Sequence, residues 1–411
     1  MQRSAFVAVL LAAQLTLEIS AAEKLLLAQV LVRHGETAPT IQGPLDDQQF
    51  NHLWPHGKGQ LTNKGIEQMY EAGAFLRGRY MDATRFLEGY SKNHTRLEAA
   101  NDGPCLQSAS ALSAAFFKPK TAKYKVAPLN DYFPVPIHSR PADEDLLLRP
   151  SHMPCRAYED AFEENFADQR EKFDEKYTKN VDAGYKLLNK HLKMDVTTVK
   201  DLRKIAAFAK AAKEQGAIGK LEYKLSFLDH GNIGEELIET SDMELIFMYN
   251  TTELAKYQAG YLLGDVLRRM KLKLSGELDY PDRKLMLFVT DLETMMPLVQ
   301  LMKIGVRSKP FPFGGVLAIE LHEIGDKKHI VKMFYRDSYK YSGSSMKLIS
   351  AEDCGHSCPL EEFEELMKDR TIDTEAERTD LCSSCGALQT ILALTTAAVI
   401  LAIYRSDKAT S

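Results

Sequence analysis

The sequence lacks several features that would assign it to particular classes of protein. Its 411 residues carry a net charge of −5, so no basic excess points to a nucleic-acid partner. It has one tryptophan and only six cysteines, of which Cys382 and Cys385 have the CxxC spacing of a redox or metal motif. Because that pair has no strand–helix context, an oxidoreductase is not favoured. The length suits one large domain with an insertion, or two domains.

Each end of the chain carries an apolar run. Residues 1–22 have the basic start, apolar stretch and small final residues of a signal peptide. Residues 386–404 contain no charged residue, and the tail, 405–411, contains Arg405 and Lys408. This pattern predicts a single membrane span with a cytoplasmic tail, and a cleaved lipid-anchor signal is the alternative. We therefore expect a single-pass type I membrane protein of the secretory pathway, at the cell surface or in the endolysosomal system.

The cysteines agree with an oxidising compartment. The six cysteines allow fifteen pairings, and Cys354 and Cys358 flank a short turn that suits a local bridge. Two sequons, at Asn93 and Asn250, are expected to carry glycans if this part of the chain is lumenal.

Apolar runs alternate with amphipathic helices from residue 25 onward. Strands are predicted at 25–32, 95–100, 124–128, 284–289, 315–321 and 329–335, and helices at 62–80, 107–117, 254–270, 292–304 and 358–369. The alternation predicts an α/β fold with a mixed, mainly parallel sheet sandwiched by helices. The last two strands are expected to form an antiparallel pair on one edge.

The composition of the chain changes near residue 156, where a charged sequence with helical periodicity and interspersed aromatic residues begins. We interpret 156–248 as a helical cap subdomain inserted into an α/β domain made of 23–155 and 249–370. A stalk, 371–385, then leads to the predicted span. The charges of the inserted segment are mixed in sign, which is typical of a solvated face.

The most informative stretch follows the first predicted strand, at Arg33-His34-Gly35. In open α/β sheets, ligands bind just beyond the carboxyl ends of strands. Arginine offers a planar set of donors to a phosphate, neutral imidazole is a nucleophile or base, and glycine lets the backbone approach a ligand. This combination predicts anion chemistry. The strand predicted at 284–289 also ends in polar residues, Thr290 and Asp291, before a helix.

Four stretches together resemble the histidine acid phosphatases, specifically the animal prostatic and lysosomal branch of the histidine phosphatase superfamily. They are LVRHGETAP (31–39), LTNKGIEQMYEAGAFLRGRY (61–80), YQAGYLLGDVLRRM with KLMLFVTDLETMMPLVQLM (257–270 and 284–302), and CGHSCPLEEF (354–363). The second stretch is the most specific, and the resemblance covers nearly all of residues 25–385.

The resemblance implies two-step hydrolysis of a phosphomonoester, on a small molecule or a phosphoprotein, without a metal or other cofactor. By this likeness His34 is the nucleophile that forms a phosphohistidine, Arg33 is a phosphate ligand, and Asp291 protonates the leaving alcohol. Cationic groups offset the charge of the phosphate oxygens, and the covalent step divides the reaction in two. Because the family is often dimeric, a homodimer is a further expectation.

The resemblance also implies a disulfide framework. Cys354 is expected to pair with Cys358, and Cys155 with either Cys382 or Cys385. Cys105, near the expected site, would then be left for the remaining stalk cysteine.

Several positions depart from the family pattern for phosphate binding. Thr37 and Pro104 stand at family arginines, Thr290 at the histidine before the aspartate, and Glu98 at another arginine. We expect Thr37 and Thr290 to contact the substrate, each with one neutral hydrogen bond. One preorganised donor is worth roughly 2.7–4 kcal/mol in the transition state, so these replacements are expected to cost several kcal/mol. The candidates for compensating cations are His56, Lys58 and Arg96.

Two interpretations therefore stay open. The first is an acid phosphatase with a rearranged phosphate site. The second is a catalytically impaired, phosphatase-like membrane glycoprotein that binds a ligand or partner without turnover.

Overall fold

The computed structural model describes residues 23–43, 45–120, 125, 127–129, 131–165, 199–214, 242, 245–306, 309–337 and 345–383. The expected signal peptide, membrane span and cytoplasmic tail lie outside these residues, as does most of the expected cap, 156–248. Within the described ranges, no helix has both the length and the apolar character needed to cross a bilayer.

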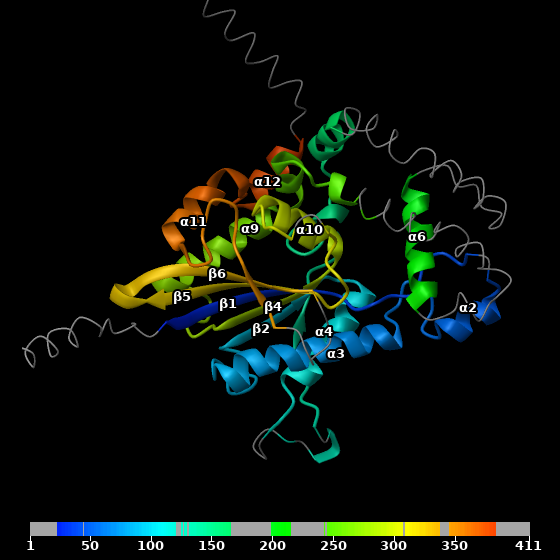
Figure 1. Ribbon diagram of the computed structural model, residues 1–411, viewed down its shortest axis with the longest axis horizontal. Helices are drawn as coiled ribbons and strands as arrows, with labels where there is room; N and C mark the ends of the chain where they lie inside the picture. The colour runs from blue at the N-terminus through cyan, green and yellow to red at the C-terminus, as the bar shows by residue number, and fades with distance from the viewer. Residues whose placement is uncertain are drawn as a thin grey trace, which may run out of the picture.

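A mixed sheet occupies the centre of the structure (Figure 1). Its strands are β1 (Lys24–Arg33), β2 (Thr95–Ala99), β3 (Ile137–His138), β4 (Leu285–Thr290), β5 (Val316–Ile324), β6 (Lys328–Arg336), β7 (Lys347–Ile349) and β8 (Cys358–Pro359). The strand order is β3-β2-β4-β1-β5-β6-β7, and β8 pairs with β6. Strands β3, β2, β4 and β1 run parallel, whereas β5 to β8 pair in the antiparallel sense.

Helices cover both faces of the sheet. Helices α3 (Asn63–Arg77) and α4 (Gly103–Phe116) lie on one face, and α9 (Thr252–Ser275) and α10 (Leu292–Leu301) lie on the other (Figure 1). Because both faces are covered, Val30, Leu31 and Val32 at the carboxyl half of β1 are all fully buried. The α/β fold with a sheet sandwiched by helices, expected from the sequence, is confirmed.

The helix predicted at 62–80 shows how closely the layers pack. Thr62 is its N-cap and accepts a hydrogen bond from the Gly65 amide at 2.9 Å, as its sequence position indicated. A Cβ atom on Gly73 would lie 2.2 Å from the carbonyl oxygen of Leu112, so glycine is required where α3 crosses α4. The helix continues into a π-helical turn, Gly78–Ala83.

Two details of the sheet differ from expectation. Part of the strand predicted at 124–128 lies outside the described residues, and Ala127–Leu129 forms a short 3-10 turn. The edge strand is instead Ile137–His138, which pairs with β2. The antiparallel pairing of β5 with β6 is confirmed, but this pair is not the edge, because β7 and β8 hydrogen-bond to β6.

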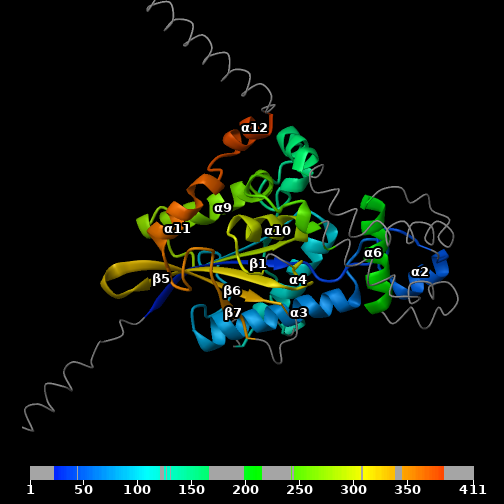
Figure 2. The same cartoon turned by 45° about the horizontal axis from the view of Figure 1, so that its top comes forward.

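One helix in the described part of the expected cap, 156–248, lies beside the carboxyl end of β1. Helix α6 (Val199–Glu214) stands next to α2 (Asp47–Leu53), as Figures 1 and 2 both show. The ring of Phe208 meets Trp54 edge-on, with centroids 5.9 Å apart. It also packs against Gly43, where a Cβ atom would lie 2.7 Å from the ring. These contacts join α6 to the segment that follows β1.

Two disulfides match those implied by the family resemblance. Cys354 is bonded to Cys358, and Cys155 is bonded to Cys382 in α12 (Glu375–Ser383). Cys105 is a free thiol, fully buried in the hydrophobic core. This differs from the expectation that it pairs with a stalk cysteine, because α4 carries it into the core. Cys385 lies outside the described residues.

Candidate active site

The register of two parallel strands brings the two expected reactive residues together. Arg33 on β1 pairs with Thr290 on β4, and the His34 amide donates to the Thr290 carbonyl at 2.9 Å. His34 and Asp291 therefore leave the sheet at the same edge, from neighbouring strands. This is the edge at which open α/β sheets bind ligands.

His34 is held in the form that a nucleophile needs. Its Nδ1 atom lies 2.7 Å from the Gly35 carbonyl oxygen, which only accepts hydrogen bonds. Nδ1 therefore carries the proton, and the lone pair of Nε2 remains available. Burial, together with the positive charge of Arg33, lowers the pKa of His34 to about 4. The imidazole is neutral at any pH well above that value.

The loop that carries His34 is clamped to the two helices beneath it. The Gly35 amide donates to the hydroxyl of Ser108 on α4 at 3.1 Å, and the Glu36 amide donates to the side chain of Gln68 on α3 at 2.8 Å. A Cβ atom at Gly35 would lie 2.2 Å from the Gly65 carbonyl oxygen. Only glycine permits this approach, which fixes the backbone next to the nucleophile.

Asp291 is held as an acid that keeps its proton near neutral pH. It is the N-cap of α10, and one carboxylate oxygen accepts from the Thr294 amide at 2.9 Å and the Thr294 hydroxyl at 3.0 Å. Burial, followed by the charge of Glu293, raises the pKa of Asp291 to about 7. A carboxyl group with such a pKa is suited to general acid catalysis.

The two threonines expected to contact substrate lie in different environments. Thr37 is half-buried and lines the cavity at His34. Thr290 is fully buried, does not line this cavity, and donates its hydroxyl proton to the Leu148 carbonyl at 2.8 Å. The expectation that Thr290 donates a hydrogen bond to substrate is not supported by this geometry, because its single proton is already used.

Pro104 and Glu98, the other two departures from the family pattern, have structural roles outside the cavity at His34. Pro104 lies in the first turn of α4, where a missing amide proton costs little, and Asp102 caps this turn by accepting from the Cys105 amide at 2.9 Å. Glu98 is buried on β2 and pairs with Arg96 at 2.9 Å. Neither Pro104 nor Glu98 lines the cavity at His34.

The cations proposed from the sequence as replacements do not reach this cavity. Arg96 faces Glu98, as described above. His56 Nε2 lies 2.9 Å from the side-chain oxygen of Asn63, and Lys58 lies over the Phe50 ring at 5.7 Å. None of the three lines the cavity at His34.

The cavity is instead bordered by α6, which contributes two lysines. It has a volume of about 480 Å³. Its walls are formed by the strand ends, the loop after β1, α6 and the segment near residue 310. The charged or ionisable residues among them, besides His34, are Arg33, Glu36, Lys204, Lys210, Asp242, Asp291 and Glu293. Lys204 and Lys210 were missed from the sequence, because a mixed-charge helix is normally solvated. The spacing of Lys204, Ala207 and Ala211 on one helical face was the available signal.

Arg33 is fixed by aromatic and backbone contacts. Its guanidinium carbon lies 4.0 Å above the centre of the Phe313 ring, and Nη1 donates to the Phe311 carbonyl. Burial raises the pKa of Asp242, while the nearby charges of Lys210 and Arg33 partly offset that effect. Asp242 therefore lies within electrostatic reach of two of the cavity's cations.

One group in the described part of the chain has the composition of a metal site. Ligand atoms of His152, Asp291 and Glu293 lie within 4.8 Å of one another. However, Arg149 Nη2 lies 2.9 Å from His152 Nε2, so a cation already occupies one side of this group. Repulsion from the guanidinium would oppose a metal ion there, and we assign no metal to these residues.

Comparison with known proteins finds animal acid phosphatases that are similar over most of the chain. Lysosomal acid phosphatase of Xenopus laevis is 25% identical over 378 residues, which cover 91% of this chain and 83% of that protein. Prostatic acid phosphatase of Mus musculus is 27% identical over 363 residues, which cover 87% of this chain and 90% of that protein.

Solved structures show the same fold. The phytase from Citrobacter braakii matches with a TM-score of 0.63 and 15% identity, over 86% of this chain and 99% of that one. Hafnia alvei phytase in complex with myo-inositol hexakis sulphate matches with a TM-score of 0.62 and 15% identity, over 85% and 98%. At this identity the likeness concerns the fold alone. The family model of the histidine phosphatase superfamily, branch 2, matches residues 24–336. Because that match spans most of the sequence, the chain belongs to branch 2 of the histidine phosphatase superfamily.

Proposed function

We propose that this protein hydrolyses phosphomonoesters through a phosphohistidine on His34, with Asp291 as the proton donor. The observation that carries the proposal is the protonation state of the pair. The lone pair of His34 Nε2 is available, and Asp291 keeps its proton up to about pH 7. Both groups lie at the same sheet edge and line the same cavity.

The two steps use these groups in turn. His34 Nε2 attacks phosphorus, the bond from phosphorus to the ester oxygen breaks, and the Asp291 proton passes to the departing alcohol. Water then attacks the phosphohistidine, Asp291 takes up a proton from that water, and the phosphorus–nitrogen bond breaks to release phosphate. Arg33 and Thr37 bind the phosphate oxygens in both steps. The second step restores the starting protonation states.

Lysines of α6 supply charge that the family pattern places elsewhere. Thr37 and Pro104 replace two arginines, while Lys204 and Lys210 line the cavity from the opposite wall. A lysine is a point charge on a flexible stem and does not grip a phosphate with two parallel hydrogen bonds. We therefore expect a slower enzyme than one with a complete arginine clamp.

The pKa values of the pair predict an acid optimum. Catalysis needs neutral His34, which requires a pH above about 4, and protonated Asp291, which requires a pH below about 7. The pH profile of kcat/KM should therefore be a bell with limbs near these values and a maximum at roughly pH 5.5.

The test is phosphate release by the purified full-length chain from an aryl phosphate between pH 4 and 8. We expect release in the wild type, an acid-labile phosphoprotein in rapid-quench samples, and loss of both in His34→Ala. His56→Ala is the matched control, because this histidine lies outside the cavity. Equal release by folded wild type and His34→Ala would overturn the proposal.

A second candidate, ligand binding without turnover, is favoured by the charge balance of the cavity. Besides Asp291, which is protonated below about pH 7, its walls carry three carboxylates, Glu36, Asp242 and Glu293, against three cations, Arg33, Lys204 and Lys210. Above about pH 7 an ionised Asp291 adds a fourth negative charge, which disfavours transfer of a proton to the leaving alcohol and so opposes turnover. Wild type that binds phosphate in calorimetry but shows neither release nor a phosphoprotein would establish this candidate.

We further propose that the catalytic part is lumenal and held by one C-terminal span. The support is the pair of apolar terminal segments, 1–22 and 386–404, together with the lysosomal and prostatic names of the relatives. Asn93 is exposed in the turn before β2, whereas Asn250 is half-buried and accepts a hydrogen bond from Asn165 at 3.0 Å. A glycosidase-sensitive mass on Asn93 would test the lumenal location. The homodimer remains a prediction.

A further inference from the structure

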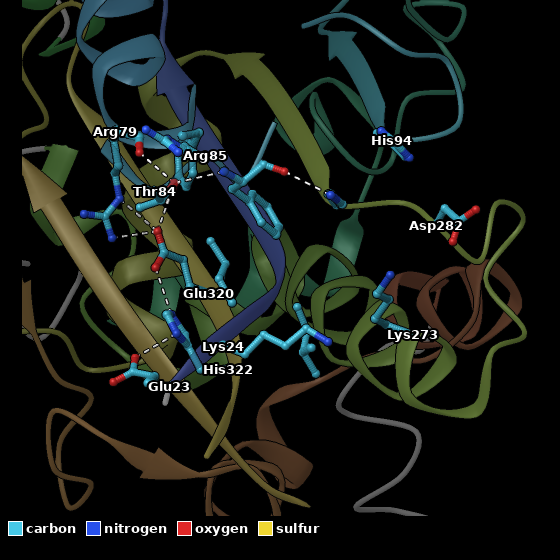
Figure 3. Close-up of a pocket in the computed structure, with 15 residues that line it drawn as sticks. Glu23, Lys24, Arg79, Thr84, Arg85, His94, Lys273, Asp282, Glu320 and His322 are labelled. Atoms are coloured by element: carbon cyan, nitrogen blue, oxygen red, sulfur yellow. Dashed lines mark hydrogen bonds and ion pairs between the residues drawn. The ribbon is translucent and has the colours of Figure 1, made fainter. Parts of the chain in front are cut away.

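A second cavity lies at the amino ends of the parallel strands, opposite the carboxyl ends that carry His34. We call it the amino-edge cavity. It has a volume of about 1060 Å³, more than twice that of the cavity at His34. Figure 3 shows it at the start of β1, where Lys24 and Glu23 enter its wall. His34 lies ten residues beyond Lys24 along β1, or about 33 Å at ~3.3 Å per residue. The amino-edge cavity is thus not an extension of the candidate active site.

Three basic residues lie near the start of three neighbouring parallel strands. Lys24 opens β1, His94 directly precedes β2, and Lys284 directly precedes β4. The His94 carbonyl accepts from the amides of Lys284 at 2.8 Å and Leu285 at 2.9 Å, which locks the last two together. Strand β1 lies beside β4 with Ala28 opposite Leu285, so Lys24 lies three residues further toward the amino end than the position beside Lys284.

Further cations reach the cavity from the helices. Arg79 and Arg85 come from the π-helical end of α3 and the turn after it, and Lys273 comes from the carboxyl end of α9. Burial is the main cause that lowers the pKa of Lys273; the charge of Asp282 opposes this shift, and the charges of Lys284 and Lys24 add to it. Lys273 thus lies within electrostatic reach of two other cations of this cavity and of one carboxylate.

The acidic residues of one wall are already neutralised. Glu320 is 1% exposed, and its oxygens accept from Arg79 at 2.8 Å, from the Tyr80 hydroxyl at 2.6 Å and from His322 at 2.9 Å. The other ring nitrogen of His322 lies 2.8 Å from a Glu23 oxygen. Figure 3 shows this chain along one wall, with Lys273, Asp282 and His94 on the opposite side.

The remaining cations have no acidic partner within salt-bridge distance. Across the described ranges, Lys24, Arg85, Lys273 and Lys284 form no ion pair, and the ammonium groups of the last two donate to backbone carbonyls. Asp282 is the only other carboxylate on this cavity's walls. Four cations against one carboxylate leave a positive excess that is open to solvent.

We propose that the amino-edge cavity binds a small anion that carries two or more phosphate groups. A single phosphate would be too small to meet cations that come from several strand starts and two helices. A chain of phosphates matches their spread, because each group can accept a charge-assisted hydrogen bond from a different element. Binding here needs no chemistry at His34. The inference is therefore independent of the proposed phosphatase activity.

The test measures tripolyphosphate binding by titration calorimetry to the full-length His34→Ala chain, so that turnover does not consume the probe. The double variant Lys24→Gln/Lys273→Gln, made in the same background, removes two of the cations. We expect the affinity of one class of sites for tripolyphosphate to fall about tenfold or more, since a hydrogen bond to a charged group contributes roughly a factor of ten to affinity. Orthophosphate should bind this class much more weakly than tripolyphosphate does.

The matched control is Lys271→Gln, which alters the same helix two residues away. Lys271 pairs with Glu364 at 3.2 Å and does not line the cavity. Arg85→Gln, at an exposed side chain, provides a second variant if the double variant folds poorly. The proposal is overturned if the folded variants bind tripolyphosphate as tightly as their parent, or if Lys271→Gln weakens binding equally.

Discussion

The two walls of the cavity at His34 are built in different ways. The sheet wall carries His34 and Asp291, whose positions follow from hydrogen-bonded strand register and from a buried N-cap. The helix wall carries Lys204 and Lys210 on α6, which meets the rest of the protein through contacts such as Phe208 with Trp54. His34 and Asp291 are therefore fixed by the sheet, whereas two of the cavity's three cations come from α6.

This difference has a consequence for catalysis. A nucleophile and an acid act only within narrow geometric limits, so they depend on a rigid support. A cation acts through a field that falls slowly with distance, so its place is less restricted. On the proposed mechanism, lysines on α6 can therefore partly replace the arginines that the family pattern has at positions 37 and 104. The nucleophile His34 has no such freedom of position.

The strongest test of the sheet wall is Asp291→Asn. We expect kcat/KM to fall by about 10²–10⁴-fold for alkyl phosphates, because the alcohol then leaves without a proton. An aryl phosphate with an acidic phenol should lose much less. The alkaline limb near pH 7 should also disappear from the pH profile, since it is assigned to this carboxyl group. An unchanged limb would assign it to another residue.

Thr37→Arg tests whether the lost clamp is what limits the rate. Thr37 lines the cavity from the loop after β1, so an arginine there has room to reach a bound phosphate. We expect kcat/KM to rise about tenfold to a hundredfold, which is less than the full value of one preorganised donor. Thr40→Arg places the same charge on an exposed residue of the cavity and is the matched control. Equal gains from both variants would show that charge alone matters.

Gly35→Ala tests the rigidity of the sheet wall. The added methyl group would lie 2.2 Å from the Gly65 carbonyl oxygen, so the loop or α3 must shift. We expect the free energy of unfolding to fall by about 1–3 kcal/mol, together with a loss of activity. Gly305→Ala is the control, since a Cβ atom there meets open space. Denaturant unfolding of both variants, monitored by circular dichroism, provides the comparison.

Lys210→Gln tests the helix wall and should have the smallest effect. We expect KM for a phosphomonoester to rise roughly threefold to tenfold with little change in kcat, because a flexible lysine binds substrate and transition state similarly. Lys213→Gln, on an exposed part of α6 outside the cavity, is the control. A fall in kcat of a hundredfold or more would instead place Lys210 in the transition-state clamp.

Sequence patterns were sufficient for the sheet wall. The apolar run before Arg33-His34-Gly35 and the polar ending after 284–289 mark strand ends, and they are neighbours because parallel strands share an edge. The sequence pattern around each strand end was enough to predict these positions. Thr290 was assigned to the substrate by position alone, and its side chain turns instead to Leu148. Rotamer direction depends on neighbours that are distant in sequence.

The sequence by itself determined the family, the strand-end residues His34 and Asp291, and the disulfide Cys354–Cys358, because each rests on contacts between residues near in sequence or on a specific pattern. Only the tertiary structure decided which cations face the cavity and that basic residues gather at the amino edge of the sheet. Both outcomes depend on how helices and strand starts pack across hundreds of residues. Packing, not local propensity, determines which side chains share a cavity.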